Sequence, residues 1–317
     1  MYIPQTTIKS NLLYKIIQIL KVDFPNLFSV NQLGRPRKYC LGKILALVTY
    51  QARSSNLSFR KIVNSLENDI LSLQILGFEK VPNFTVIFKS YTKYLKSNMN
   101  IYLKVIGNKI YKNENTFYLD SSSLITSKLD KESRLGKSTR LGWYSGYKLH
   151  LICNSKGIPL SFEITTANIH DSKCDTLIST LSQIKPGADI FADKGYDSSR
   201  LLKHSKDLGV NLICPLNKRK AKKLELDKIK DSSRRSNYIY LTSREGRHRY
   251  GKRWEIERLF GNLKENYSID NHRVRGLNRK FFNVSFKLLL FTIEKAIAVL
   301  KIIQYFCNSL FYKTIKK

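Results

Sequence analysis

The sequence predicts an α/β fold in which a mixed β-sheet follows a mostly helical N-terminal region. Apolar residues recur at helical spacing through much of residues 1–112. Two short apolar runs, starting at 115 and 187, end in Asp120 and Asp193 respectively. Residues 146–167 form two alternating segments joined by "NSKG", which is typical of a β-hairpin. Strands and helices then alternate, as in a mixed sheet covered by helices.

The N-terminal region predicts several short helices. "LGKILALVTYQARSSNLSFRKIVNSL" at 41–66 has a helical pattern that a Ser-Ser-Asn stretch interrupts. A basic, aromatic helix is expected after the Pro-Asn pair at 82–83. Two short helices followed by a basic one suggest a helix-turn-helix-like module that reads DNA, and a helical bundle with solvated lysines explains the pattern equally well.

The remaining elements follow in order along residues 113–317, the second predicted domain. A helix is expected from about 172 with Asp171 as its N-cap, then a helix at 199–209 and a strand at 210–216. Residues 217–249 are rich in Lys and Arg and are predicted to be a basic loop or small insertion. A buried C-terminal helix is expected at about 282–307.

The charge of the chain points to an anionic partner. The sequence contains 56 Lys and Arg against 24 Asp and Glu, a formal net charge of +32. Such a charge opposes compact folding by self-repulsion, so nucleic acid is the first expected partner and an acidic membrane surface the second. Charged residues interrupt the most apolar stretch, so no membrane span is expected. The five widely spaced cysteines fit a reduced, cytoplasmic protein without a zinc site.

The stretch "YGKRWEIERLFGNLK" at 250–264 has helical periodicity. On one continuous helix, four polar residues fall within about 60° of arc: Tyr250, Arg253, Glu257 and Lys264. An apolar stripe lies beside them, whereas Glu255 is expected to face solvent. A surface helix with an Arg253–Glu257 ion pair is the simple alternative.

Asp120, Asp193 and Glu257 can together form an all-oxygen cluster. Carboxylates at the ends of neighbouring strands can converge with a third on an adjacent helix, and such a set suits Mg²⁺ or Mn²⁺. Two such ions can activate a water or 3′-hydroxyl and stabilise the leaving oxygen in phosphodiester displacement. In a strongly basic protein this cluster predicts nuclease-like chemistry on DNA.

The spacing of the four polar residues resembles the Y-x2-R-x3-E-x6-K signature of DDE transposases from prokaryotic insertion sequences. Further similar segments are "YLDSS" around Asp120, "GYKLHL", "TANIHDS", "ADKGYDS" around Asp193, and "HRVRGL". The resemblance covers about residues 115–300 well and "LSFRKIVNSL" more loosely.

The resemblance implies an RNase H-like catalytic domain with Asp120 on its first strand, Asp193 at the end of its fourth and Glu257 on a later helix. These three would hold two Mg²⁺ or Mn²⁺ ions. It also implies nicking at the element's ends, attack of the freed 3′-hydroxyl on target DNA, and at least a homodimer in the DNA complex. Residues implied or considered as DNA contacts are Tyr250, Arg253, Lys264, Lys194, Arg273 and Arg275, the last three with solvated surface charge as an equal alternative.

The interval between Asp193 and Glu257 is too short for the large β-rich insertion of some relatives. Residues 217–249 either take over its DNA-handling role or form a linker. Two other functions stay open: a metal-dependent nuclease that cuts without joining, and a sequence-specific DNA-binding protein with structural carboxylates. Smaller alternatives also remain open, such as an acid–base pair at His170 and Asp171, and a substrate-facing strand with Lys148 and His150.

Overall fold

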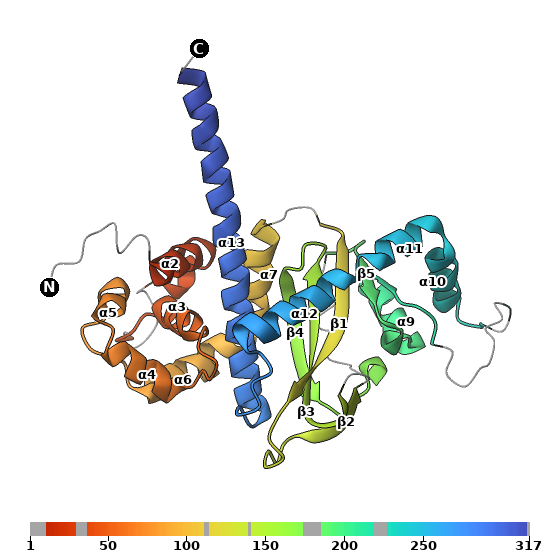
Figure 1. Cartoon of the computed structure of the whole chain (residues 1–317), viewed down its shortest axis with the longest axis horizontal. Helices are drawn as coiled ribbons and strands as arrows, with labels where there is room; N and C mark the ends of the chain where they lie inside the picture. Colours follow the sequence, from red (N-terminus) through yellow and green to blue (C-terminus); the bar gives the residue numbers. More distant parts are fainter. Residues whose placement is uncertain are drawn as a thin grey trace. The chain divides into compact units, whose positions relative to one another are not determined.

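The structure is a computed structural model of two compact units. It describes residues 11–29, 37–110, 114–138, 141–173, 185–217, 227 and 229–315, with the backbone alone in 301–315. One unit comprises residues 1–110 and 282–317, and the other comprises residues 111–281 (Figure 1). In the part that is described, no helix has both the length and the apolar character that crossing a membrane requires.

The first unit is helical, as the sequence predicts. Its helices are α2 (Leu12–Asp23), α3 (Leu41–Gln51), α4 (Phe59–Glu67), α5 (Ile70–Leu76), α6 (Phe84–Ser90) and α7 (Met99–Ile110), with short helical turns η1 (Pro25–Leu27), η2 (Tyr91–Leu95) and η3 (Lys96–Asn98). Ser58, Asp69 and Asn83 begin α4, α5 and α6, and each accepts a hydrogen bond from a backbone N–H of the first turn. The break at 52–58 therefore lies where the Ser-Ser-Asn stretch predicts it.

The C-terminal helix α13 (Leu277–Ile315) is longer than the expected 282–307. From Phe282 onward it groups with the first unit, whereas the prediction placed all of residues 113–317 in the second domain. The physical reason is an aromatic cluster. The ring centroid of Phe282 lies 4.3 Å from that of Phe59 and 4.9 Å from that of Tyr91. Asn283 also donates a hydrogen bond to the carbonyl of Leu57 at 3.0 Å.

The second unit is built on a mixed sheet. Its strands are β1 (Thr116–Ile125), β2 (Arg134–Ser138), β3 (Gly142–Asn154), β4 (Pro159–Thr166), β5 (Asp189–Ala192) and β6 (Asn211–Ile213). β3 pairs antiparallel with β1, β2 and β4, whereas β5 is parallel to both β1 and β6. The order β4–β3–β1–β5–β6 and these directions are those of the RNase H-like fold, and the predicted α/β class is confirmed. The "NSKG" hairpin forms as expected between β3 and β4.

Helices cover both faces of this sheet. Helix α9 (Ser199–Asp207) buries Leu201 and Leu202 in a core with Phe117 and Leu119 of β1. Helix α12 (Trp254–Tyr267) packs on β1, and Figure 1 shows it crossing that strand. Because side chains alternate along a strand, Leu119 faces α9 and Asp120 faces the α12 side. The short turns η4 (Asp171–Lys173) and η5 (Lys194–Tyr196) flank the sheet. Of the helix expected from about 172, residues 172–173 belong to η4 and the rest lies outside the described residues.

The basic stretch predicted as a loop or small insertion is helical from Ser232 to its end, apart from Ser243. It contains α10 (Ser232–Thr242) and α11 (Arg244–Gly251). Asp231 begins α10 by accepting hydrogen bonds from two backbone N–H groups, and Ser243 begins α11 by accepting one from Gly246. These caps, together with polar anchors to the sheet described below, explain why a stretch with few apolar residues folds into helices.

Candidate active site

Asp120 and Asp193 lie side by side on adjacent parallel strands. The β1–β5 register pairs Thr116 with Asp189 and Leu119 with Ala192, so Asp120 and Asp193 form the next pair. Adjacent strands are about 4.8 Å apart. Asp193 keeps an extended backbone (φ −69°, ψ 161°), so the strand's alternation continues through it. Both carboxylates therefore belong to the sheet face that α12 covers.

Arg253 joins this pair to the third predicted carboxylate. Its Nη1 donates to Asp120 Oδ2 at 2.7 Å, and its Nη2 donates to Glu257 Oε1 at 2.8 Å. Arg253 immediately precedes α12, and Glu257 is one helical turn further on. The guanidinium also lies 5.9 Å from the ring centroid of Tyr250. The structure thus brings together Asp120, Asp193, Glu257, Arg253 and Tyr250.

The electrostatics of Asp120 favour a nearby cation. Burial raises the pKa of the Asp120 carboxyl to about 6, against the opposing effects of the Arg253 charge and the hydrogen bond from the Ser121 N–H. The charge of Asp193 raises it further. Burial also raises the pKa of Tyr250, with Arg253 opposing. Holding Asp120 ionised at this place therefore costs free energy unless positive charge is added.

The two glutamates of α12 differ in exposure, but not as expected. The side chain of Glu255 is 14% exposed and pairs with Arg258 at 2.5 Å, whereas that of Glu257 is 58% exposed. The Glu255 backbone and side chain approach the glycine turn of the β3–β4 hairpin at Gly157. The prediction that Glu255 faces solvent is therefore wrong. Glu257 is nevertheless the glutamate that meets Arg253.

The other predicted DNA contacts are spread over the second unit. Lys194 is exposed and directly follows Asp193, and Lys264 lies two turns beyond Glu257 on α12. Arg273 and Arg275 are exposed and flank Val274, whose carbonyl accepts a hydrogen bond from Thr126 at the far end of β1. Lys194 and Lys264 thus adjoin site residues in the sequence, whereas Val274, between Arg273 and Arg275, meets the strand six residues or about 20 Å from Asp120.

Polar residues on the opposite sheet face form a separate cluster. Lys148 donates to Asp171 at 3.1 Å, and His150 is bonded to Thr165 and Tyr196. His150 pairs across the strands with Ser121, so this cluster faces away from Asp120. Lys148 and His150 therefore cannot face a substrate bound at the three carboxylates, because their side chains lie on the opposite face of the sheet.

Two interactions near the site were missed by sequence reasoning. Asp197 accepts two hydrogen bonds from Arg234 at 2.8 and 2.6 Å. Asp189 forms an ion pair with Arg249 at 2.7 Å. Asp189 lies four residues before Asp193, so strand alternation could have placed both on one face. The pairing with Arg249 has no such sequence signal.

The oxygen donors of the site suit a divalent metal in type. Carboxylates are the ligands that Mg²⁺ and Mn²⁺ prefer. Among the described residues, however, no three His, Cys, Asp or Glu side chains form a group that could hold one metal ion. Arg253 instead supplies positive charge between Asp120 and Glu257. The donors therefore suit a divalent metal in chemical type but are not gathered around one point, because the Arg253 guanidinium stands between Asp120 and Glu257.

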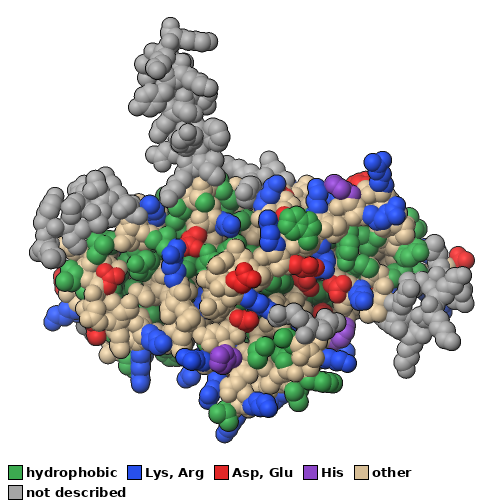
Figure 2. Space-filling view, viewed as in Figure 1, with side chains coloured by type: hydrophobic (Ala, Val, Ile, Leu, Met, Phe, Trp, Pro, Cys, Tyr) green, Lys and Arg blue, Asp and Glu red, His purple; other side chains and the backbone are tan. Residues whose placement is uncertain are grey.

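The surface around the site has mixed charge. Figure 2 shows acidic side chains over the region of α12 and β1, with Lys and Arg side chains around them.

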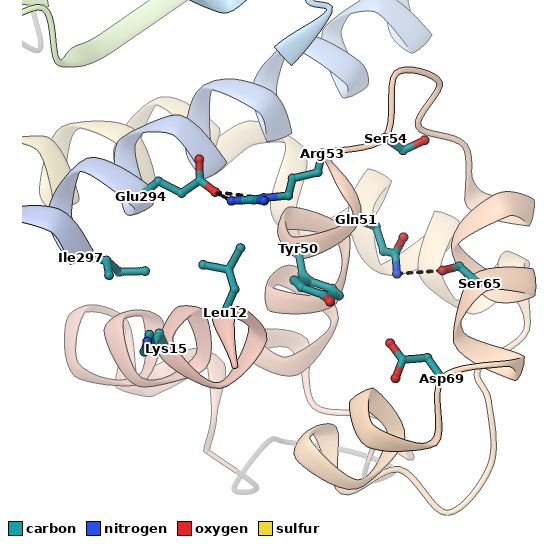
Figure 3. Close-up of a pocket in the computed structure, with 10 residues that line it drawn as sticks. All are labelled: Leu12, Lys15, Tyr50, Gln51, Arg53, Ser54, Ser65, Asp69, Glu294 and Ile297. Carbon is teal, nitrogen blue, oxygen red and sulfur yellow. Dashed lines mark hydrogen bonds and ion pairs between the residues drawn. The ribbon is translucent and has the colours of Figure 1, made fainter. Parts of the chain in front are cut away.

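A separate cavity of about 610 Å³ lies in the first unit, between α2, α3, α4 and α13 (Figure 3). Its polar groups are satisfied locally: Arg53 pairs with Glu294, and Gln51 donates to Ser65 at 3.1 Å. It lacks the convergent carboxylates of the second unit.

Comparison with known proteins identifies the family. The transposase DDE domain family matches residues 84–293, more than half of the chain. The transposase for insertion sequence element IS1106 of Neisseria meningitidis serogroup B is 35% identical over 86 residues, which span 27% of this chain and 29% of that protein. The Mos1 transposase paired-end complex with left transposon end covers 77% of this chain and 81% of its own, at 9% identity and a TM-score of 0.23, a value too low to support a structural conclusion. The resemblance drawn from the helix signature is confirmed, and the chain belongs to the transposase DDE domain family.

Proposed function

We propose that this protein is a DNA transposase that nicks DNA at the ends of its element and joins the freed 3′-hydroxyl to target DNA. One observation carries the proposal: Asp120 and Asp193 are neighbours on parallel strands, and Arg253 links Glu257 to Asp120. Membership of the transposase DDE domain family supports the same reaction class.

Asp120, Asp193 and Glu257 are the proposed ligands of two Mg²⁺ or Mn²⁺ ions. When bound, such ions supply activation of the attacking oxygen and stabilisation of the leaving oxygen. The carboxylate of Asp120 already attracts one cation, since the Arg253 guanidinium lies 2.7 Å from its Oδ2. Arg253 must release Asp120 for this, and a DNA phosphate offers its guanidinium an equivalent bidentate anion.

The DNA partner is proposed from charge and position. Arg253, Lys264 and Lys194 are proposed to contact phosphates near the cleaved bond, and Tyr250 to pack against the DNA there. Arg273 and Arg275 are proposed to hold the duplex further away, since they lie at the other end of β1. The helical region 1–112 is proposed to bind DNA or to dimerise. Two element ends require two copies of the chain, acting in the prokaryotic cytosol.

The first test is cleavage of a duplex that carries the element's terminal sequence, with Mg²⁺ or Mn²⁺. Wild type is compared with Glu257→Gln and with Glu255→Gln, a matched change two residues away. We expect Glu257→Gln to abolish cleavage with DNA binding retained, and Glu255→Gln to cut. Unaltered cleavage by Glu257→Gln would mean that this glutamate is only the partner of Arg253, and the proposed site would fail.

A strand-transfer assay separates the remaining alternatives. Pre-cleaved end DNA with a free 3′-hydroxyl is incubated with plasmid target and the wild-type protein. Joined products support the transposase, whereas cleavage without joining identifies a nuclease. Metal-independent binding with neither product identifies a DNA-binding protein whose carboxylates are structural.

A further inference from the structure

Helix α11 presents a basic face that the residues of the candidate active site do not include. Arg244, Arg247 and His248 are exposed, and with Gly251 they occupy about 100° of arc on the helix. In the described part of the chain, these three side chains have neither an ion pair nor a hydrogen-bond partner. Glu245 lies at the edge of this face. Figure 2 shows basic side chains and a histidine over the region where α11 lies in Figure 1.

The opposite side of α11 is fixed to the sheet by Arg249. Its guanidinium pairs with Asp189 at 2.7 Å and donates to Thr116 Oγ1 at 2.8 Å and to Tyr240 Oη at 2.9 Å. It also lies 5.1 Å from the ring centroid of Phe191. Arg249 is therefore satisfied by the protein itself, and its anchoring directs the Arg244–Arg247 side of the helix outward.

The neighbouring helix α10 holds α11 in a defined position. Gly246 lies against it so closely that an added Cβ would be 2.0 Å from the carbonyl oxygen of Tyr240. Helix α10 is in turn held by Arg234 on Asp197 and by Asn237, which donates to the carbonyl of Leu212 at 3.0 Å. An exposed basic face on a helix with so many fixed contacts is pre-positioned for its partner, and less ordering entropy is lost on binding.

Helix α11 is anchored near the carboxylates. Arg249, on the side of α11 opposite the basic face, contacts β1 at Thr116, and Arg253 contacts β1 at Asp120, four residues or about 13 Å further along the strand. This length corresponds to roughly four base pairs of duplex DNA at 3.4 Å each. Only Lys252 and Arg253 separate α11 from α12, so a duplex that enters the site can continue along α11.

We propose that the outward face of α11 binds the phosphate backbone of the DNA about four base pairs from the bond that is cut, with Arg244 and Arg247 as its main contacts. Charge selects this partner, since a face with unpaired arginines matches a polyanion. The inference rests on the proposed transposase function and adds to it a DNA-binding surface. No base reading is required of these residues, so the contact should be independent of sequence.

The test is the salt dependence of binding to a fluorescent 30-base-pair duplex of random sequence, measured from 50 to 200 mM KCl. All proteins carry Glu257→Gln so that the DNA stays intact. Each lost phosphate contact should reduce the slope of log affinity against log salt by about 0.9. We therefore expect Arg244→Gln/Arg247→Gln to flatten the slope by about 1.8, with an affinity loss about tenfold larger at 50 mM than at 200 mM.

Lys203→Gln/Lys206→Gln is the matched control. Lys203 and Lys206 are also exposed and three residues apart on a helix, but α9 covers the other face of the sheet. The control should leave the slope almost unchanged, and Arg244→Lys/Arg247→Lys should keep most of it. If Lys203→Gln/Lys206→Gln flattens the slope as much as Arg244→Gln/Arg247→Gln does, the effect is one of net charge. If Arg244→Gln/Arg247→Gln does not flatten the slope, these arginines make no phosphate contact. Either result overturns the proposal.

The position of the contact can be tested on the cleaved end DNA. Uncharged methylphosphonates placed about three to five base pairs from the cut should weaken binding of the parent but not of Arg244→Gln/Arg247→Gln. Equal weakening in both proteins would overturn the placement. The two proposals can fail separately. If wild type cuts DNA but Arg244→Gln/Arg247→Gln leaves the salt dependence of binding unchanged, only the α11 surface is refuted. Wild type that neither binds nor cuts refutes the proposed function.

Discussion

Acidification should destabilise the second unit because His150 is buried as a neutral imidazole. Its side chain is fully buried in β3, with Nδ1 3.1 Å from Tyr196 Oη and Nε2 3.0 Å from Thr165 Oγ1. Burial lowers the pKa of His150 from 6.5 to about 4. The carboxylate of Asp171, 3.9 Å away, opposes this shift, and the charge of Lys148 adds to it.

The sign and size of the effect follow from proton linkage. The unfolded chain takes up the proton near pH 6.5, whereas the folded protein does so only near pH 4. Between these values the unfolded state holds more protons, so the free energy of unfolding falls as the pH is lowered. The difference between the two pKa values corresponds to at most about 3 kcal/mol, lost between pH 6.5 and 4.

Urea unfolding of wild type and His150→Gln from pH 7.5 to pH 4 tests this. The glutamine variant should be less stable at pH 7.5, but it should lose less stability on acidification than wild type does. His272→Gln removes an exposed imidazole and serves as the control, with an expected change below about 0.5 kcal/mol. A parallel pH dependence of wild type and His150→Gln, or a His150 imidazole signal that titrates near pH 6.5 by NMR, would refute the reasoning.

Three further substitutions test the packing of the second unit, each by urea unfolding. Gly246→Ala should lower the free energy of unfolding by about 1–3 kcal/mol, because the added Cβ would meet the Tyr240 carbonyl. Gly251→Ala is the control, since its Cβ would enter open space and should change stability little. Equal effects of the two substitutions would contradict the close contact. Asp130→Asn should destabilise by about 1–3 kcal/mol, because the buried carboxylate accepts hydrogen bonds from two hydroxyls and two backbone N–H groups; an unchanged midpoint would show that these bonds are weak. Arg249→Gln should cost about 2 kcal/mol by removing an ion pair and two hydrogen bonds, and a stable variant would refute its anchoring role.

Local chemistry made most elements predictable from the sequence. Ser58 and Asn83 begin helices where their types predict, and the Asn154 side chain accepts hydrogen bonds from the Lys156 and Ile158 N–H groups of the "NSKG" turn. The grouping of residues 282–317 was not accessible in this way. It depends on contacts between Phe282 and residues more than 190 positions earlier, such as Tyr91 and Phe59, and no local pattern specifies such pairs.

The error over Glu255 comes from judging its exposure from the helical wheel alone. Helix α11 ends at Gly251 and α12 begins at Trp254, so the wheel misplaces Tyr250 and Arg253, but it leaves the angles within α12 unchanged. Counted within α12 alone, the two glutamates flank the buried stripe almost equally, at about 90° and 110° from its centre. Their exposure is then decided by neighbours, and Glu255 is the one that meets the Gly157 turn.

The same break gives Arg253 its place in the site. On a continuous helix, a residue four positions before Glu257 could only pair with it along the helix surface. Because Arg253 stands at the junction of α11 and α12, its guanidinium reaches both Glu257 and Asp120 on β1. The signature spacing predicts which residues gather, but the break between the helices decides that an arginine separates two of the three carboxylates. If the three carboxylates hold metal as proposed, Arg253 has to move away from Asp120, and the proposed contact with a DNA phosphate offers it another anion.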